Sequence, residues 1–88
     1  MKELDIASYL KTEDDYRVFL QEVAETGTAS DFVHALGIVA RAKGMAQVAA
    51  DTGVTRTALY QSLSDAGNPT FSTVFGVMQS LGLKFAIA

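Results

Sequence analysis

The chain has 88 residues, which is enough for one compact domain but too few for two. Apolar residues make up 49% of it and charged residues 19%, with a single proline, so we expect a folded, globular protein. The formal net charge is −3, and the chain has one histidine and no cysteine for a disulfide, a thiolate metal site or a cysteine nucleophile, so we expect no enzyme, no metal site and no cofactor.

At the N-terminus, residues 1–5 lack the basic and then apolar layout of a signal peptide. No apolar run in the chain reaches the ~18 residues that are needed to cross a bilayer. We therefore expect a cytoplasmic protein with no membrane partner. Ile6, Tyr9 and Leu10 follow at helical spacing, which predicts an opening helical turn or two.

A first long helix is predicted to begin at Glu13. Thr12 and Asp15 have the spacing of a capping box with Asp in place of Glu, and the acids that follow Thr12 suit the positive end of a helix dipole. Gly27 can supply the left-handed residue that closes the helix. The apolar face is expected to comprise Tyr16, Phe19, Leu20 and Val23.

A second long helix is predicted from an N-cap at Ser30 to a stop at Gly44. Arg41 and Lys43 lie in its last turn, where the helix dipole favours cations. Its inner face is expected to comprise Phe32, Leu36, Val39, Ala40 and Lys43.

After Gly44 the predicted helices become short. Met45 to Thr52 forms one helix, Gly53 breaks it, and another runs from Thr55 to about Leu63. Two short helices joined by a tight glycine turn are the layout of a helix-turn-helix unit, which we place between Met45 and Leu63. The small and apolar residues that two crossed helices need are Ala49, Val54, Leu59 and Leu63.

A turn and a last helix complete the chain. Residues 65–69, Asp-Ala-Gly-Asn-Pro, are the densest turn signal, and Pro69 can stand at the start of the following helix. Gly82 is expected to end that helix, and residues 83–88 alternate weakly, as in an edge strand that can pair with another chain. The apolar face of the last helix is expected to comprise Phe71, Val74, Phe75, Met78 and Leu81.

Residues 53–57 read Gly-Val-Thr-Arg-Thr, which resembles the Gly-Val-Ser-Arg-Ser-like turn of the lambda-repressor/Cro-like helix-turn-helix family. Nearly the whole chain is similar to antidote proteins of bacterial addiction modules, through the acidic N-terminal helix pair and residues 40–45, 58–60, 67–71 and 81–83. The chain departs from that pattern at two positions. The glutamine usual near the start of the first short helix is Gln47 rather than residue 45, and the usual leucine of the last helix is Val74.

The resemblance implies an all-α fold, a lambda-repressor-like helix-turn-helix bundle with an N-terminal helical extension and a short extended C-terminal tail. Residues 1–29 would form the acidic extension, packed on the same domain, and residues 30–88 the DNA-binding domain. It also implies a HigA-like antitoxin of a type II toxin-antitoxin module. Such a protein neutralises a small basic RelE/HigB-like toxin and binds operator DNA as an autorepressor.

In a helix-turn-helix unit the second helix lies in the major groove of double-stranded DNA. Arg56 can then contact a phosphate or the O6 and N7 atoms of a guanine, Thr57 can meet a thymine methyl, and Gln61 can pair with adenine. Each of these side chains can instead be a solvated helix residue, and Asn68 can instead be a residue of the turn. The candidate DNA contacts are Gln47, Thr55, Arg56, Thr57, Tyr60, Gln61 and Asn68.

The predicted DNA-binding domain carries few cations, namely Arg41, Lys43, Arg56 and Lys84. One copy would therefore release few counterions and bind weakly. We expect a homodimer on a pseudo-palindromic operator, with half-sites about one helical turn, ~34 Å, apart.

The charge is divided along the chain. Residues 1–31 carry eight acids and three bases, net −5, whereas residues 32–88 carry two acids and four bases, net +2. A toxin that binds RNA is basic, so an acidic amphipathic helix is a suitable partner surface. The apolar stripe of that helix can instead pack on the core, and one helix can do both. The candidate toxin contacts are Glu13, Asp14, Tyr16, Phe19 and Glu22.

Two other functions remain open at this point. A stand-alone, phage-like transcriptional repressor would carry the same helix-turn-helix unit without a toxin partner, and only the N-terminal extension favours the antitoxin over it. The chain could also be an interaction adaptor that has kept the fold and lost DNA binding, which its net negative charge supports. A small basic reading frame beside the gene would favour the antitoxin.

Overall fold

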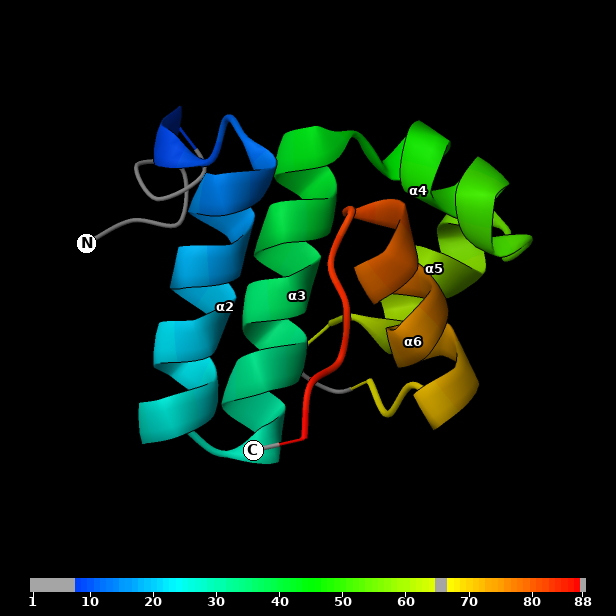
Figure 1. Cartoon of the computed structure of the whole chain (residues 1–88). Helices are drawn as coiled ribbons and strands as arrows, with labels where there is room; N and C mark the ends of the chain where they lie inside the picture. The colour runs from blue at the N-terminus through cyan, green and yellow to red at the C-terminus, as the bar shows by residue number, and fades with distance from the viewer. Residues whose placement is uncertain (1–7, 65–66, 88) are drawn as a thin grey trace.

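A computed structural model describes residues 8–64 and 67–87, and Ile6 of the predicted opening turn lies outside them. Within the described residues every regular element is a helix, so the all-α prediction is confirmed (Figure 1). None of these helices is both long and apolar enough to cross a membrane. The helices are α2 (Glu13–Thr26), α3 (Ala29–Lys43), α4 (Met45–Thr52), α5 (Arg56–Ser62) and α6 (Phe71–Ser80).

The helices form two groups that share α3. α2 and α3 run antiparallel, side by side, and α4 to α6 lie on the other side of α3 (Figure 1). α4 packs against α3, α5 and α6, so it connects the short helices to the long pair. The C-terminal tail, residues 83–87, has no strand pairing within the described chain and runs back between α3 and α6 (Figure 1).

The two groups of helices share one hydrophobic core. Leu36, Val39, Val48, Leu59 and Leu81 are all fully buried, and together they come from α3, α4, α5 and the end of α6. The N-terminal segment contributes buried side chains to this same core, namely Leu10, Tyr16 and Leu20. The division of the chain into residues 1–29 and 30–88 stays a prediction. α3 begins at Ala29, and its buried side chains belong to the common core.

The start of α2 is as predicted. Thr12 Oγ1 accepts a hydrogen bond from the Asp15 amide at 3.1 Å, and the Asp15 carboxylate accepts one from the Thr12 amide at 3.0 Å. This reciprocal capping box satisfies two amides that have no partner inside the helix.

The junction between α2 and α3 differs from the prediction in two respects. Thr28, not Ser30, is the N-cap of α3, because Thr28 and Asp31 form a second capping box, whereas the residue three positions after Ser30 is Val33, which cannot complete one. Gly27 is extended, with φ −110°, rather than left-handed. The chain must already be extended there to enter the N-cap at Thr28.

The last helix also begins differently. Thr70 is its N-cap, with Oγ1 accepting from the Thr73 amide at 3.2 Å, so Pro69 precedes the cap instead of opening the helix. The end is as predicted. Gly82 has φ +80°, and the amides of Gly82 and Leu83 donate to the carbonyls of Gln79 and Met78, both at 3.0 Å, which is a Schellman motif.

Phe71 and Phe75, which were predicted on the apolar face of α6, lie outside the core. Their side chains are 68% and 39% exposed, whereas Val77 and Met78 are buried. The apolar arc of this helix is wider than the strip that touches the core, and the two phenylalanines, one turn apart, occupy its outer flank.

Candidate functional site

The segment predicted as a helix-turn-helix unit consists of two short helices joined by a tight turn. Gly53 ends α4 in the left-handed region, with φ +77°, and its amide donates to the Ala49 carbonyl at 2.9 Å. Ala49 is buried, α4 packs on α5, and Val54 packs against the core after the turn. This segment therefore has the helix, turn and helix that were expected from Ala49 and Gly53.

α5 presents one polar face to solvent. Thr55 is its N-cap, as predicted, with Oγ1 accepting from the Ala58 amide at 3.1 Å. Leu59 is fully buried, so at about 100° per residue Thr57 and Gln61 lie on the side of α5 directly away from the core. Arg56 and Tyr60 lie on one flank of that face. All four side chains are exposed.

No ion pair or hydrogen bond to the Arg56 guanidinium occurs among the described residues. Its charge is thus available for an anionic partner. Tyr60 is 41% exposed, so part of its ring rests on the protein and part remains accessible. The exposed face of α5 therefore combines one cation, two hydrogen-bonding side chains and an aromatic edge, which are groups that contact phosphates and base edges.

Gln47 is held in a cluster of polar groups that joins α3, α4 and α6, here called the polar junction. The Gln47 amide donates to Asp51 Oδ1 at 2.8 Å, and the Ser80 hydroxyl donates to Asp51 Oδ2 at 2.7 Å. The Lys43 ammonium donates to the Ser80 carbonyl at the end of α6. Since the Gln47 side chain has two N–H donors, one remains available for a phosphate.

Asp51 was not among the predicted functional residues, although its spacing of four from Gln47 on one helix is visible in the sequence. Its hydrogen bond to Ser80 joins residues that are 29 positions apart, and no local pattern indicates that contact. The polar junction fixes α4 relative to α6 and so sets the orientation of the α4 to α5 segment.

The polar junction makes the stability of the fold sensitive to acid. Hydrogen bonds from Ser80 and Gln47, and then the charge of Lys43, lower the pKa of Asp51 below its ordinary value of 3.8. The Lys11 and Thr12 amides lower the pKa of Asp15 in the same direction. A carboxylate whose pKa is lowered in the folded state stabilises the fold above its unfolded pKa, and this contribution is lost as the pH falls through the folded value.

We therefore expect the free energy of unfolding to decrease as the pH falls from about 5 to about 3. Over this pH range the free energy of unfolding should decrease less in the Asp51→Asn variant than in the wild type, because the asparagine side chain has no charge to neutralise. Urea unfolding at several pH values measures the difference. An equal loss in both proteins would show that Asp51 does not contribute to the acid sensitivity.

Asn68 lies apart from these groups. It is exposed, and it shares a small hollow with Ala29, Ser30 and Val33 at the start of α3. The preceding residue, Gly67, packs so closely on the last carbonyls of α5 that a Cβ there would collide with them. The loop that carries Asn68 is thus closely packed on the C-terminal end of α5.

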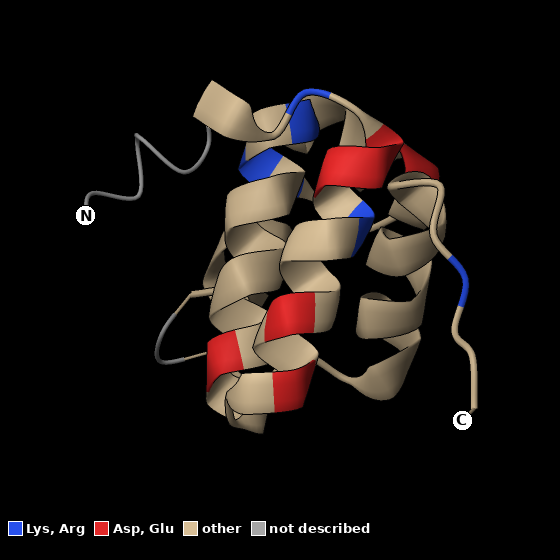
Figure 2. Cartoon of the chain, turned by 60° about the vertical axis from the view of Figure 1, so that its left-hand side comes forward, with Lys and Arg blue, Asp and Glu red and all other residues tan. Residues whose placement is uncertain are grey.

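The acidic residues of α2 lie near both of its ends (Figure 2). Glu13, Asp14 and Glu22, three of the predicted toxin contacts, are exposed, and Asp14 forms an ion pair with Arg17. The fourth, Tyr16, is buried in the core, so its ring is not available at the surface.

Phe19, the fifth predicted contact, is half-buried and lines a shallow hollow of about 450 Å³ on the outer side of α2. Tyr9 and Val18, which are 73% and 53% exposed, also line it, and Asp14 and Glu22 lie at its edge. Neither Tyr9 nor Val18 was among the predicted functional residues. Val18 could have been found, because it falls outside the apolar stripe of α2 and must face solvent.

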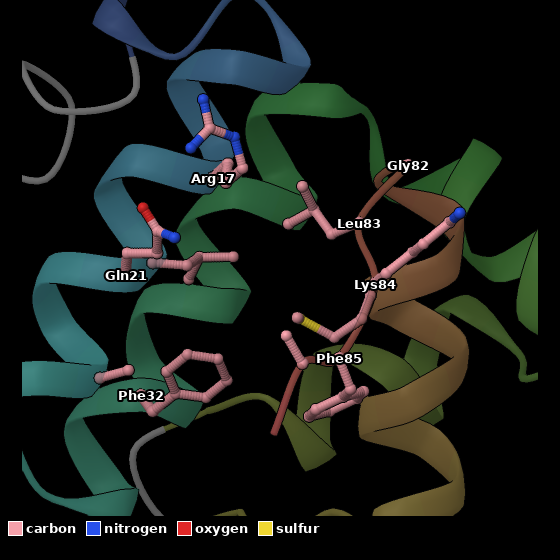
Figure 3. A pocket seen from close by; sticks show the side chains of 11 residues that line it. Arg17, Gln21, Phe32, Gly82, Leu83, Lys84 and Phe85 are labelled. Atoms are coloured by element: carbon pink, nitrogen blue, oxygen red, sulfur yellow. The ribbon is translucent and has the colours of Figure 1, made fainter. Parts of the chain in front are cut away.

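A second hollow, of about 550 Å³, separates α2 and α3 from the C-terminal tail (Figure 3). Arg17, Gln21 and Phe32 lie on one side of it, and residues 82–86 form the other side. Leu83 points into this space from the tail (Figure 3). The hollow leaves the edge of the tail that faces α2 uncovered.

Comparison with known proteins gives two matches. A family model described as "Probable addiction module antidote protein" matches residues 1–88. A protein of Haemophilus influenzae that carries the name "Uncharacterized protein" is 40% identical over 87 residues, which cover 99% of this chain and 90% of that protein. No solved structure matches the chain.

Proposed function

The chain belongs to the family of probable addiction module antidote proteins, and we propose that it is the antitoxin of a type II toxin-antitoxin module. The observation that carries this proposal is the family match, which extends over residues 1–88. Its partner would be a small basic toxin of the RelE/HigB type. As a HigA-like, lambda-repressor-like homodimer in the cytoplasm, it would also bind operator DNA and repress its own operon.

The arrangement of α4 and α5 supports the DNA-binding part of the proposal. The exposed face of α5 offers Arg56, Thr57 and Gln61 to the major groove, with Thr55 and Tyr60 toward the sugar-phosphate backbone. α4 has no side-chain cap at its N-terminus, so its first amides remain open to a phosphate beside Gln47. Asn68 would contact the backbone from the loop after α5.

The outer side of α2 supports the toxin-binding part. It combines exposed apolar groups, Tyr9 and Val18, with carboxylates at the edge of the same hollow. An apolar centre with a charged rim is the usual composition of a protein interface, and the negative rim complements a basic RNA-binding surface. Phe19 would contribute from the floor of the hollow, whereas Tyr16 would act only by supporting α2 from the core.

The proposal is tested by reversing the charge of this surface. In a variant with Glu13, Asp14 and Glu22 all replaced by lysine, we expect binding to the toxin encoded by the adjacent gene to weaken about tenfold or more. The wild-type complex should weaken steeply with salt, and operator binding by the variant should be unchanged or slightly tighter. Calorimetry at two salt concentrations, with helicity checked by circular dichroism, measures both affinities.

A matched pair locates the effect on α2. Glu22 lines the hollow and Glu25 does not, although both are exposed and lie in the second half of the same helix. Glu22→Lys should weaken toxin binding more than Glu25→Lys, which changes the net charge equally. If the folded triple variant neutralised the toxin as well as the wild type does, the acidic surface of α2 would be excluded as the toxin-binding site. Operator binding without any toxin binding by the wild type would identify a stand-alone repressor.

A further inference from the structure

Three phenylalanines stack on one another at the surface where α6 meets the C-terminal tail. The ring centroids of Phe71, Phe75 and Phe85 are 5.4 to 5.9 Å apart, and the rings of Phe75 and Phe85 are nearly parallel. Their exposed fractions are 68%, 39% and 44%, and Ile87, two residues after Phe85 in the tail, is fully exposed. These four residues are here called the aromatic patch.

We propose that the aromatic patch and the adjoining tail are the interface through which two copies of this chain form the homodimer. The inference rests on the proposed function only for the expectation of a dimer, and it specifies where that dimer forms. An aromatic side chain has ~150–250 Å² of surface that can be buried. With the exposed fractions above, the aromatic patch exposes on the order of 400 Å² of apolar surface. This area is about half of the ~800 Å² that each partner buries in a stable interface. It is therefore large enough to form the apolar centre of such an interface.

The charges near the aromatic patch favour a second copy over the toxin. α6 contains no charged residue, and Lys84 is the single charge of residues 83–87. A basic RNA-binding partner needs carboxylates opposite its cations, and these lie on the outer side of α2, at Asp14 and Glu22. A neutral aromatic surface is self-complementary, which is what a two-fold interface requires.

The tail adds unpaired backbone groups to this surface. Among the described residues, no backbone hydrogen bond joins residues 84–87 to another part of the chain. The hollow of about 550 Å³ keeps the α2-facing edge of the tail open (Figure 3). An extended segment with an open edge can pair antiparallel with its own copy across a two-fold axis. The second tail would then lie in this hollow, against Phe85, which belongs to the aromatic patch and also lines the hollow.

The test is a variant with Phe71→Glu and Phe85→Glu, studied without DNA and without toxin. The two side chains are 68% and 44% exposed and neither belongs to the core, so the helical fold should persist, as circular dichroism can check. We expect the dissociation constant of the dimer, measured by sedimentation, to rise about a hundredfold or more, because buried aromatic surface is replaced by like charges. The matched control is Tyr9→Glu, at a similarly exposed aromatic residue outside the patch, which should leave the dimer intact.

Hydrogen exchange supplies the second measurement. The amides of residues 84–87 should exchange slowly in the concentrated wild type and rapidly on dilution or in the double variant. A wild type that stays monomeric throughout the micromolar range, or a double variant that dimerises as well as wild type, would overturn the proposal. Toxin binding is measured separately with the α2 variants, so a failure of this interface is distinct from a failure of the antitoxin function.

Discussion

Gly37→Ala is expected to destabilise the fold, although alanine is the better helix former. Gly37 lies inside α3, where a Cβ would be 2.8 Å from the carbonyl oxygen of Leu63 and 3.4 Å from its Cβ. The oxygen belongs to the backbone at the end of α5, so it cannot rotate away and α5 must move. Overpacking of this kind costs ~1–3 kcal/mol, against a helix-propensity gain of about 1 kcal/mol. We expect a net loss of up to about 2 kcal/mol in the free energy of unfolding.

Gly76→Ala is the matched control, because Gly76 also lies inside a helix. A Cβ there would meet only the Thr52 side chain, with the Cγ2 atom at 3.4 Å, which is ordinary van der Waals contact. This substitution should stabilise the protein by about 0.5–1 kcal/mol. Urea unfolding of both variants measures the difference in sign. If Gly37→Ala were as stable as Gly76→Ala, the close approach of α3 to α5 would be disproved.

The elements that could be predicted from the sequence are those fixed by neighbouring residues. Thr12 and Asp15 form their capping box within four positions, and Gly53 and Gly82 end their helices in the left-handed region that glycine favours. The exposed face of α5 followed from the positions of Leu59 and Leu63 alone. For this reason Arg56, Thr57 and Gln61 were found at the surface as expected.

The predictions that failed concern competition between neighbouring signals or contacts between distant residues. Ser30 is a suitable N-cap residue, but Thr28, two residues earlier, forms a complete capping box with Asp31 and is the N-cap of α3. The period of α6 identified an apolar arc but not how much of it touches the core, so it did not show that Phe71 and Phe75 lie outside the core. The bond between Asp51 and Ser80 depends on the packing of α4 on α6, and no local pattern reports that packing.

Arg56→Ala is expected to have the largest effect on operator binding, because Arg56 is the cation of the exposed α5 face. Loss of a guanine contact costs ~1–3 kcal/mol of binding free energy. A dimer loses this contact in both half-sites, so we expect the free energy of operator binding to weaken by about 2–6 kcal/mol per dimer. The preference at one base pair of each half-site should relax. If Arg56 contacts a phosphate instead, affinity should fall uniformly across sequences, and the salt dependence should decrease by about one counterion per copy.

Binding isotherms on the operator and on single-base variants, at several salt concentrations, separate these two roles of Arg56. The matched control is Lys11→Ala, which removes the same charge from an exposed residue just before α2, away from α5. It should change operator affinity little, since a distant surface charge is screened beyond the Debye length of about 10 Å. Both side chains are exposed, so neither substitution should alter the stability of the fold by more than about 0.5 kcal/mol. Operator affinity that is unchanged in Arg56→Ala would remove this residue, and with it the proposed reading face of α5, from the DNA interface.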